Sequence, residues 1–318
     1  MASLTISYDV PPEVLEALRD GRQEGRWIRC KCPFCDPEGR KSRNLAVGER
    51  GWKCHRCNAQ LLHHAERKKL HLKFRTSGSE AADEQRRRQI ALQIVEECSS
   101  IQSGDPVDRY LREQRSLHPV GDLWPGELRR HGKLWHRDTK REYVGMIAIV
   151  RDAGGMVSAI HRTYLLDDGR RADGKDVPRH LQVSDAKLTM GPLRGGHSVV
   201  LGEDPNADTI CVAEGLESTL AFMMRLRLVG RSGLNANGLE AMTLPAWVRK
   251  VYIGPDLGDK GGPNGHGKHA GMRAALRLRE RVIAEAKAAG RRLAVEIMAP
   301  PIGERGDWAD WAKLVAAS

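Results

Sequence analysis

The sequence has no long hydrophobic run and no segment of secretory form. No stretch reaches the ~18 consecutive apolar residues that a membrane-spanning helix needs, although 40% of the 318 residues are apolar, an ordinary fraction for a globular protein. Residues 1–10 lack the charged and then apolar pattern of a signal peptide. We therefore expect a cytoplasmic protein, long enough for two domains and a small third.

Acidic residues are fewer than basic ones. The chain has 41 Asp and Glu against 52 Lys and Arg, which gives a net charge of +11 and a pI near 9.5. Residues 1–75 contain 16 Lys and Arg but only 9 Asp and Glu, so +7 of the net charge lies there. A solvated basic surface needs no partner, but so uneven a segment favours a polyanion, and we predict nucleic acid.

Cysteine is scarce, and its spacing argues against a disulfide framework. Four of the seven cysteines form two Cys-x-x-Cys pairs separated by eighteen residues, Cys32/Cys35 and Cys54/Cys57. In a reducing compartment such pairs indicate metal rather than disulfides. Two tight turns with two thiolates each can complete a tetrahedral Zn²⁺ site. Because four protein ligands leave no open position, the predicted zinc is structural.

The predicted zinc segment also carries aromatic rings among cations. These residues are Arg26, Trp27, Arg29, Trp52, Lys53 and Arg56. Rings and cations together stack the bases and neutralise the phosphates of single-stranded nucleic acid. Either tryptophan could instead form the small core of the segment. Cys30 and His55 are spare ligand candidates, although they break the symmetry of the cysteine pairs.

Acids follow two predicted strands in the second half of the chain. The apolar run 210–213 ends in an acid and a glycine, and a helical pattern begins at once; the segment 250–256 also ends in an acid. Open α/β folds keep their chemistry at the carboxyl ends of strands. Carboxylates gathered there would repel one another without a divalent cation, so we predict a Mg²⁺ or Mn²⁺ site. Its candidate ligands are Glu214, Asp256, Asp259, Asp307 and Asp310.

The remaining segments have mixed patterns. The sequence predicts helices over 11–20, 80–98 and 105–114, a linker at 73–80, and a hairpin formed by strands near 146–165. A second basic region begins in that hairpin and continues on glycine-rich segments. Its candidate contacts to nucleic acid or triphosphate are Arg162, Lys175, Lys187 and Arg194.

One glycine-rich segment imitates a nucleotide-binding loop. Residues 262–268 match the first seven positions of the P-loop pattern between a predicted strand and a helix. The next residue is His269, where a P-loop needs Ser or Thr to hold Mg²⁺. We therefore expect a flexible glycine loop beside the acidic site, with Lys268 touching phosphates, rather than an ATPase site.

Taken together, the motifs resemble a known family. Cys-Pro-Phe-Cys at 32–35 followed by Trp-Lys-Cys-His-Arg-Cys at 52–57 looks like the zinc ribbon of bacterial and bacteriophage DNA primases. Ala-Glu-Gly-Leu-Glu at 213–217, Asp256 and Asp-Trp-Ala-Asp at 307–310 look like the TOPRIM domain of phage and plasmid primases. The intervening segments, among them Tyr-Leu-Arg at 110–112, His-Arg-Thr-Tyr-Leu at 161–165 and Gly-Pro-Leu-Arg-Gly-Gly at 191–196, are similar to the stretch that precedes TOPRIM. The zinc signature alone is common, but its order with the other motifs makes the resemblance specific.

The resemblance implies an α/β fold. We expect a zinc ribbon at 25–62, a linker and helix at 63–104, a mixed α+β basic subdomain at 105–205, and a TOPRIM domain at 206–318. The TOPRIM domain would have a Rossmann-like parallel sheet with flanking helices.

The resemblance also implies an enzyme, a DNA primase that makes short RNA primers from ribonucleoside triphosphates on single-stranded DNA. Glu214 would match the TOPRIM glutamate, and Asp256 the first acid of its Asp-x-Asp motif. The second acid would fall at position 258, which is Gly258. Either Asp259 takes that catalytic role after a shift of one residue, or the metal site is weakened.

Two alternatives use the same features. A TOPRIM nuclease would cut phosphodiesters at the same metal site, and a zinc-ribbon adaptor with a decayed acidic site would load replication proteins without catalysis. Gly258 favours the adaptor, whereas no tyrosine has an obvious setting for topoisomerase chemistry. Because no helicase segment follows the acids, we expect any replicative helicase to be a separate protein, in a bacterial cell or of phage, plasmid or integrated-element origin.

Overall fold

The computed structural model of the chain describes residues 2–6, 10–24, 27–35, 43–48, 51–55, 60–62, 70–74, 77–202, 204, 206–258, 270–303 and 306–318. The chain divides into two units, Met1–Asp83 and Glu84–Ser318. Five predicted functional residues lie outside the described residues, namely Arg26, Arg56, Cys57, Asp259 and Lys268.

In its described part, the first unit contains short antiparallel strands, a short helix, and the start of the helix that begins at Ser77. The helix α1 (Pro12–Leu18) starts with a proline, whose missing N–H has no partner in a first turn anyway, and it buries Val14 and Leu18. A five-stranded antiparallel sheet has the order β2-β3-β4-β5-β6. Its strands are β2 (Arg22–Glu24), β3 (Trp27–Cys30), β4 (Leu45–Gly48), β5 (Gly51–Cys54) and β6 (Gln60–Leu62).

The segment around residue 75 differs from the sequence prediction. A separate two-stranded sheet joins β1 (Ala2–Ile6) to β7 (Leu70–Phe74). The helix α2 (Ser77–Glu96) begins three residues after β7 ends. The predicted linker at 73–80 is therefore wrong for most of its described length, because its polar, glycine-containing sequence takes part in a strand and a helix. The predicted helices over 11–20 and 80–98 are confirmed.

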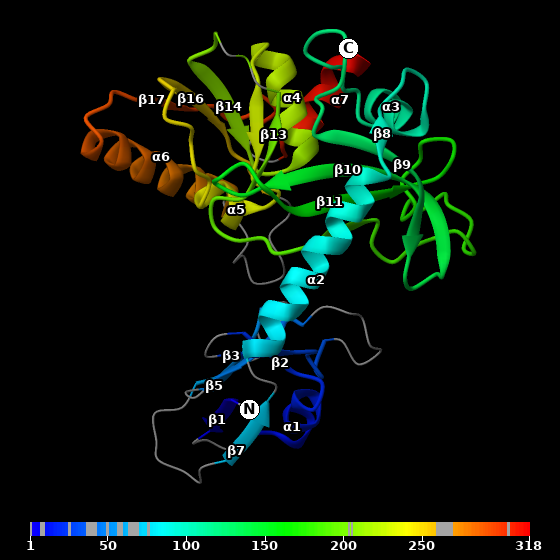
Figure 1. Cartoon of the computed structure of the whole chain (residues 1–318), viewed down its shortest axis with the longest axis vertical. Helices are drawn as coiled ribbons and strands as arrows, with labels where there is room; N and C mark the ends of the chain where they lie inside the picture. Colours follow the sequence, from blue (N-terminus) through cyan, green and yellow to red (C-terminus); the bar gives the residue numbers. More distant parts are fainter. Residues whose placement is uncertain are drawn as a thin grey trace. The chain divides into compact units, whose positions relative to one another are not determined.

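A ten-stranded mixed sheet organises the second unit (Figure 1). Its main path has the order β12-β11-β10-β13-β15-β14-β16-β17, while β9 pairs with β10 and β8 pairs with β9. The strands are β8 (Ser99–Ser100), β9 (Leu128–His136), β10 (Arg141–Arg151), β11 (Val157–Leu165), β12 (Lys187–Met190), β13 (Ser198–Leu201), β14 (Thr209–Ala213), β15 (Gly230–Ser232), β16 (Lys250–Gly254) and β17 (Ala294–Ile297). The helical segments are α3 (Pro106–Arg109), the π-helical turn η1 (Tyr110–Gln114), α4 (Leu216–Leu226), α5 (Ala236–Glu240), α6 (Ala270–Ala288) and α7 (Trp308–Ala317).

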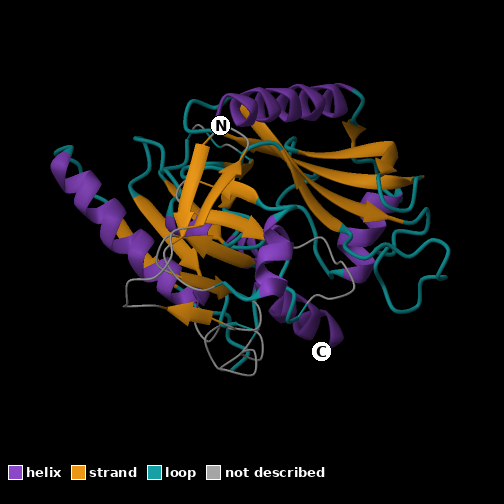
Figure 2. Ribbon diagram, turned by 90° about the horizontal axis from the view of Figure 1, so that it is seen from below, coloured by secondary structure: helices purple, strands orange, loops and turns teal. Residues whose placement is uncertain are grey.

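The strands β15, β14, β16 and β17 are parallel and have helices on both faces. Alternate residues of a strand point to opposite faces. Cys211 of β14 belongs to the core with α4 and α7, whereas Val212 belongs to the core with α6. Figure 2 shows α6 at the left of the parallel strands and the C-terminal helix on their other side. This arrangement buries most of β14 and β16 and leaves their carboxyl ends to carry a site.

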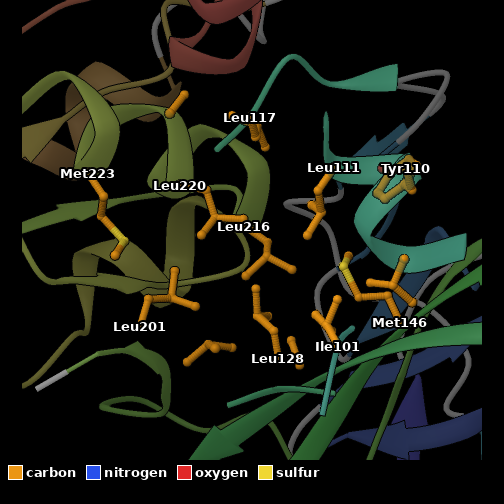
Figure 3. Packing of buried hydrophobic residues seen from close by; sticks show 14 of the residues in the cluster. Ile101, Tyr110, Leu111, Leu117, Leu128, Met146, Leu201, Leu216, Leu220 and Met223 are labelled. Atoms are coloured by element: carbon orange, nitrogen blue, oxygen red, sulfur yellow. The ribbon is translucent and has the colours of Figure 1, made fainter. Parts of the chain in front are cut away.

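The strands β8 to β12 form an antiparallel part of the same sheet. One of its faces packs against the second half of α2, in a core with Ile147 and Ile160. The other face shares a core with η1 and α4 (Figure 3), in which Met146, Leu111 and Leu216 take part. The antiparallel and parallel parts are therefore joined by packing as well as by strand pairing. Among the described residues, no helix is long and apolar enough to cross a lipid bilayer.

Candidate functional site

Two predicted metal ligands lie at one edge of the parallel strands. Glu214 follows β14 and Asp256 follows β16, and the last residues of these strands, Ala213 and Gly254, pair directly. Burial first, and then the charges of Asp256 and Asp307, raise the pKa of the Glu214 carboxyl from 4.5 to about 7. We refer to Glu214, Asp256 and Asp307 as the acidic cluster. Their mutual repulsion is the condition that a divalent cation would relieve.

Backbone contacts hold Glu214 in place. The Ser232 hydroxyl donates a hydrogen bond of 3.0 Å to the Glu214 carbonyl oxygen. The backbone N–H of Ala236, at the start of α5, hydrogen-bonds the Glu214 carboxylate and opposes the rise of its pKa. The position of the carboxylate is therefore set by two segments that follow β14 in the chain.

The loop after Asp256 explains why the sequence departs from the Asp-x-Asp pattern. The Asp256 carboxylate accepts a hydrogen bond of 2.8 Å from the N–H of Gly258. Gly258 has a φ of +85°, a conformation that glycine adopts without the steric cost of a Cβ. A Cβ on Gly271, at the start of α6, would lie 2.4 Å from the Asp256 carbonyl oxygen. The loop therefore needs glycine at 258 and at 271, and Asp259 lies outside the described residues.

Asp307 and Asp310 have a local structural role at the start of α7. Asp307 is the N-cap of this helix, and its carboxylate accepts from the Asp310 N–H at 2.9 Å. The exposed Asp310 returns the contact by accepting from the Asp307 N–H at 3.3 Å, which completes a capping box. Ser218 of α4 donates to the other Asp307 oxygen at 2.8 Å. Helix capping therefore accounts for both acids, although Asp307 also faces Glu214.

A second group of charges surrounds Glu217, three residues after Glu214. Glu217 is 5% exposed and accepts a hydrogen bond of 2.7 Å from the Tyr110 hydroxyl. Lys187 Nζ lies 2.5 Å and an Arg115 guanidinium nitrogen 3.8 Å from the same carboxylate oxygen. Burial alone would raise the pKa of Glu217, but the Lys187 and Arg115 charges and the two hydrogen bonds lower it far below its usual range. We refer to Glu217, Lys187, Arg115 and Tyr110 as the ion-pair cluster.

The ion-pair cluster borders the acidic cluster. The negative charge of Asp307 acts on Arg115, and Ser218, the neighbour of Glu217, bonds to Asp307. His161 of β11 lies nearby and feels the charges of Glu217 and Lys187. Burial lowers the pKa of His161 to about 4, so the ring is neutral near pH 7. Two cations and an array of carboxylates are thus adjacent at one end of the sheet.

The four predicted cations of the second basic region do not share one surface. Lys187 pairs with Glu217, and Arg194 forms an ion pair with Glu84. Arg162 points to the opposite face of the sheet, where it lies over the Tyr164 ring and donates to the Tyr164 hydroxyl at 3.1 Å. Lys175 is exposed on the loop between β11 and β12. The structure does not bring these four residues together.

Three of the four predicted zinc ligands converge in the first unit. The Sγ atoms of Cys32, Cys35 and Cys54 lie within 4.8 Å of one another, and those of Cys35 and Cys54 are 3.7 Å apart. A Zn–S bond of about 2.3 Å in a tetrahedron places the sulfurs about 3.8 Å apart, whereas a disulfide would need about 2.05 Å. The described thiols therefore fit a zinc site. Cys30 is buried beside them but is not part of this group.

The aromatic residues of this unit have different exposures. Trp52 is 6% exposed and belongs to the core, whereas Trp27 is 37% exposed. Phe34, between two of the predicted zinc ligands, is 48% exposed and stacks on Trp52 with ring centroids 5.4 Å apart. Lys53 is exposed, and Arg29 lies 3.6 Å from Glu24 in a weak ion pair. The sequence interpretation missed Phe34, although its place inside a Cys-x-x-Cys turn was a signal.

Sequence interpretation also missed the partners of Glu217. The sequence did contain a signal: Glu217 lies in a predicted helix among apolar and small residues. A charge buried in such a helix needs a partner of opposite charge or a hydrogen bond. The helix α4 buries eight consecutive residues from Leu216 to Met223, Glu217 among them. Which residues supply the partner charges depends on distant contacts that the sequence does not reveal.

Comparison with known proteins gives limited likenesses. Residues 85–201 match a family described as a domain of unknown function (DUF7146). No curated protein matches the chain.

Three solved structures are similar at low identity. The primase fragment of the bacteriophage T7 primase-helicase protein is 14% identical, with 89% of this chain and 93% of that chain covered and a TM-score of 0.35. A DnaG primase catalytic domain bound to single-stranded DNA is 17% identical, with coverages of 74% and 78% and a TM-score of 0.38. The Escherichia coli primase catalytic core is 16% identical, with coverages of 76% and 70% and a TM-score of 0.34. Because these TM-scores lie below 0.5, the function proposed below depends on the residues and geometry of this chain.

Proposed function

We propose that the chain is a DNA primase with a TOPRIM-type catalytic site, which synthesises short RNA primers on single-stranded DNA from ribonucleoside triphosphates. The observation that carries the proposal is the convergence of Glu214, Asp256 and Asp307 at the carboxyl ends of parallel strands, where the pKa of Glu214 rises to about 7. Carboxylates that raise one another's pKa in this way suit a divalent cation.

In this proposal Glu214 and Asp256 hold Mg²⁺ or Mn²⁺, together with Asp259 of the following loop. Asp307 contributes from the N-cap of α7, and Asp310 supports it through the capping box. A bound divalent cation supplies the charge that favours an ionised 3′ hydroxyl and a leaving pyrophosphate. The chain itself supplies the orientation, because the Ser232 hydroxyl donates to the carbonyl of Glu214 and the Gly258 N–H donates to the carboxylate of Asp256.

The neighbouring cations fit the triphosphate of an incoming nucleotide. Lys187 and Arg115 have side chains that are 30% and 19% exposed, so each can reach a ligand while its contact with Glu217 keeps it in position. Phosphate oxygens accept strongly from such donors. We propose that the ion-pair cluster binds the triphosphate beside the metal site, and that Arg162, Lys175, Arg194 and Lys268 contact nucleic acid or its phosphates.

The first unit is proposed to bind one structural Zn²⁺ through Cys32, Cys35, Cys54 and Cys57. Metal–thiolate binding is worth on the order of 10 kcal/mol of folding free energy in zinc-finger peptides. Metal analysis of protein purified without chelator should find about one zinc per chain, and Cys54→Ser should lose it and unfold this unit. Protein without zinc, or an unchanged Cys54→Ser variant, would contradict the assignment.

Primer synthesis is the direct test of the proposed function. The full chain is incubated with single-stranded DNA, Mg²⁺ or Mn²⁺ and labelled ribonucleoside triphosphates, and the products are separated by size. Short labelled RNA supports a primase, whereas cleavage of the DNA would instead indicate a nuclease. Binding of DNA with neither product would favour an adaptor that works with a replicative helicase, and adding a helicase to the assay would test that partner.

A further inference from the structure

The hairpin formed by β9 and β10 presents an exposed tryptophan that no predicted site includes. Trp135 is 54% exposed, the highest value among the tryptophans named as exposed in the described part of the chain. The turn between the strands covers 137–140, and Lys140 has a φ of +51°. Tryptophan combines a large apolar ring with a polar N–H and is enriched at binding interfaces.

The inner face of the hairpin fixes the backbone that carries this ring. His136 is 2% exposed and makes edge contacts with Tyr143 and Tyr164 at centroid distances of 5.9 and 4.8 Å. The Tyr164 hydroxyl donates to the Trp135 carbonyl oxygen at 3.0 Å, and the Tyr143 hydroxyl bonds to Thr139 in the turn at 3.2 Å. The hairpin is therefore a rigid support, so little entropy is lost when the ring meets a ligand.

The charges around Trp135 favour a polyanion. Lys133 lies two residues before it in β9, and Arg137 and Lys140 lie in the turn that follows. None of these three cations forms an ion pair with another residue in the described part of the chain. Four exposed cations, with Arg141 as the fourth, outnumber the two acids of the hairpin, Asp138 and Glu142. By contrast, Lys187 and Arg194, predicted to bind nucleic acid, are paired with glutamates of the chain itself.

The strand register places Trp135 on the face that carries the candidate site. Trp135 pairs with Glu142, and residues 142, 144 and 146 of β10 alternate onto one face of the sheet. Met146 pairs with Thr163, and Thr163 pairs with Lys187. Directly paired residues lie on the same face. Trp135 and Lys187 of the ion-pair cluster therefore lie on the same side of the sheet, separated by the core that this face forms with η1 and α4.

We infer that Trp135, flanked by Lys133 and Arg137, is a stacking platform for a base of single-stranded nucleic acid. Aromatic stacking and unpaired cations are the two parts of sequence-independent single-strand binding. The inference rests on the proposed function in one respect, which is that the bound single strand is the template for primer synthesis at the acidic cluster.

The test is the affinity of the full chain for a fluorescently labelled oligothymidylate, measured by anisotropy. Trp135→Ala should weaken binding about 10-fold, because stacking on one aromatic ring contributes roughly a 5- to 100-fold gain. Trp135→Phe should stay within about threefold of the wild type. The matched control is Trp247→Ala, which removes a tryptophan that is 42% exposed elsewhere on the chain and should leave the affinity unchanged.

A second variant tests the cations and does not depend on the fold of the Trp135 variant. In Lys133→Ala/Arg137→Ala, the slope of log K against log salt should fall by about 1.4, since each phosphate contact to a single strand contributes about 0.7. Melting followed by circular dichroism checks that the variants are folded.

Unchanged affinity in folded Trp135→Ala would overturn the inference. A chain that binds single strands through Trp135 but makes no primers would contradict the proposed function and leave this inference standing.

Discussion

Glu214 and Glu217 lie at the junction of β14 and α4, yet they have opposite surroundings. Glu214 faces two other carboxylates, and burial together with their charges raises its pKa to about 7. Glu217 is buried more deeply, but Lys187, Arg115 and Tyr110 contact its carboxylate and lower its pKa. The carboxylates of the acidic cluster therefore raise the pKa of Glu214, whereas the cations of the ion-pair cluster lower the pKa of Glu217.

This difference separates a binding role from a supporting role. A carboxylate whose charge is already neutralised by the chain gains little from a metal ion, so Glu217 is a poor ligand despite its place in the motif. Glu214 destabilises the folded state when it is ionised, and it gains when a cation arrives. Sites that bind ligands commonly hold groups that are unfavourable in their absence.

The largest expected effect comes from removing the acids that face each other. Glu214→Gln and Asp256→Asn should each lower primer synthesis about a thousandfold, because charge stabilisation by a metal ion contributes several kcal/mol to the barrier. Single-strand binding should remain nearly intact, since the basic surfaces carry it. The matched control is Glu296→Gln, which removes a half-exposed acid that pairs with Lys250 on the neighbouring strand and should leave synthesis unchanged.

The same assay decides the role of the loop after Asp256. Asp259→Asn should cause a loss similar to that of Asp256→Asn if Asp259 replaces the acid missing at position 258. Wild-type synthesis by all three variants would refute the metal-site assignment.

The next effect concerns the ion-pair cluster and is one of stability. Glu217→Gln should lower the free energy of unfolding by about 3 kcal/mol near neutral pH, because it leaves the charges of Lys187 and Arg115 without their partner. The pKa of Glu217 is lowered on folding, so its contribution is fully present above its usual value of 4.5 and is lost as the pH falls below it. The deficit of the variant, measured by urea unfolding, should therefore shrink in acid.

A double variant checks that the loss comes from the unpaired charge. Glu217→Gln/Lys187→Met should recover part of the stability, because both partners of one contact are then removed. Equal stability of Glu217→Gln and the wild type near pH 7 would show that the contacts of Glu217 with Lys187 and Arg115 do not stabilise the folded protein.

Substitution of Glu214 should change the free energy of unfolding in the opposite direction from substitution of Glu217, and by less. Without divalent metal, Glu214→Gln should stabilise the protein by about 1–2 kcal/mol near pH 8, a value reduced for the partial exposure of the carboxyl. The raised pKa means that this destabilisation begins as the pH rises above 4.5 and is complete above about 7. The advantage of the variant should therefore vanish below about pH 4.5.

Adding Mg²⁺ should reverse the order of stability, because only the wild type gains from the cation. Thermal melts with and without Mg²⁺ measure both effects. A variant that is less stable than the wild type in metal-free buffer at about pH 8 would contradict the strained acidic cluster.

The smallest effect tests the hydrogen bond that joins the two clusters. Ser218→Ala removes the donor to Asp307 and should cost about 1 kcal/mol of stability. Ser318→Ala, which removes an exposed hydroxyl that bonds only to Val315 in the last turn, serves as the control and should cost nothing measurable. Equal stability of the two variants would show that the clusters are independent.

Local sequence patterns predict the acidic edge well, because each element there is specified by neighbouring residues. The apolar run before Glu214 is the strand β14, the helical periodicity after it is α4, and the same logic gives β16 before Asp256. The capping box at Asp307 and Asp310 shows the limit of such patterns, since two acids three residues apart are typical of both a metal site and a helix start.

Contacts between distant segments could not be predicted in this way. Tyr110 and Glu217 are 107 residues apart in the chain, and no periodicity connects them. The burial of Trp52 was equally open, because a ring beside cations suits both a core and a nucleic-acid surface. The exposed Trp135 belongs to β9, and the sequence of this strand has no regular alternation of apolar and polar residues from which a strand could be predicted.

The pairing of β10 with β13 joins the antiparallel and parallel parts of the large sheet, and it bears on how the second unit unfolds. Only two residue pairs connect these strands, Val150 with Val199 and Arg151 with Ser198. Side chains on both sides of the join nevertheless belong to one apolar core, from Met146 through Leu201 to Met223 (Figure 3). Amide protons on the two sides should therefore exchange with similar slow rates, since that core must come apart before either set of strands is released.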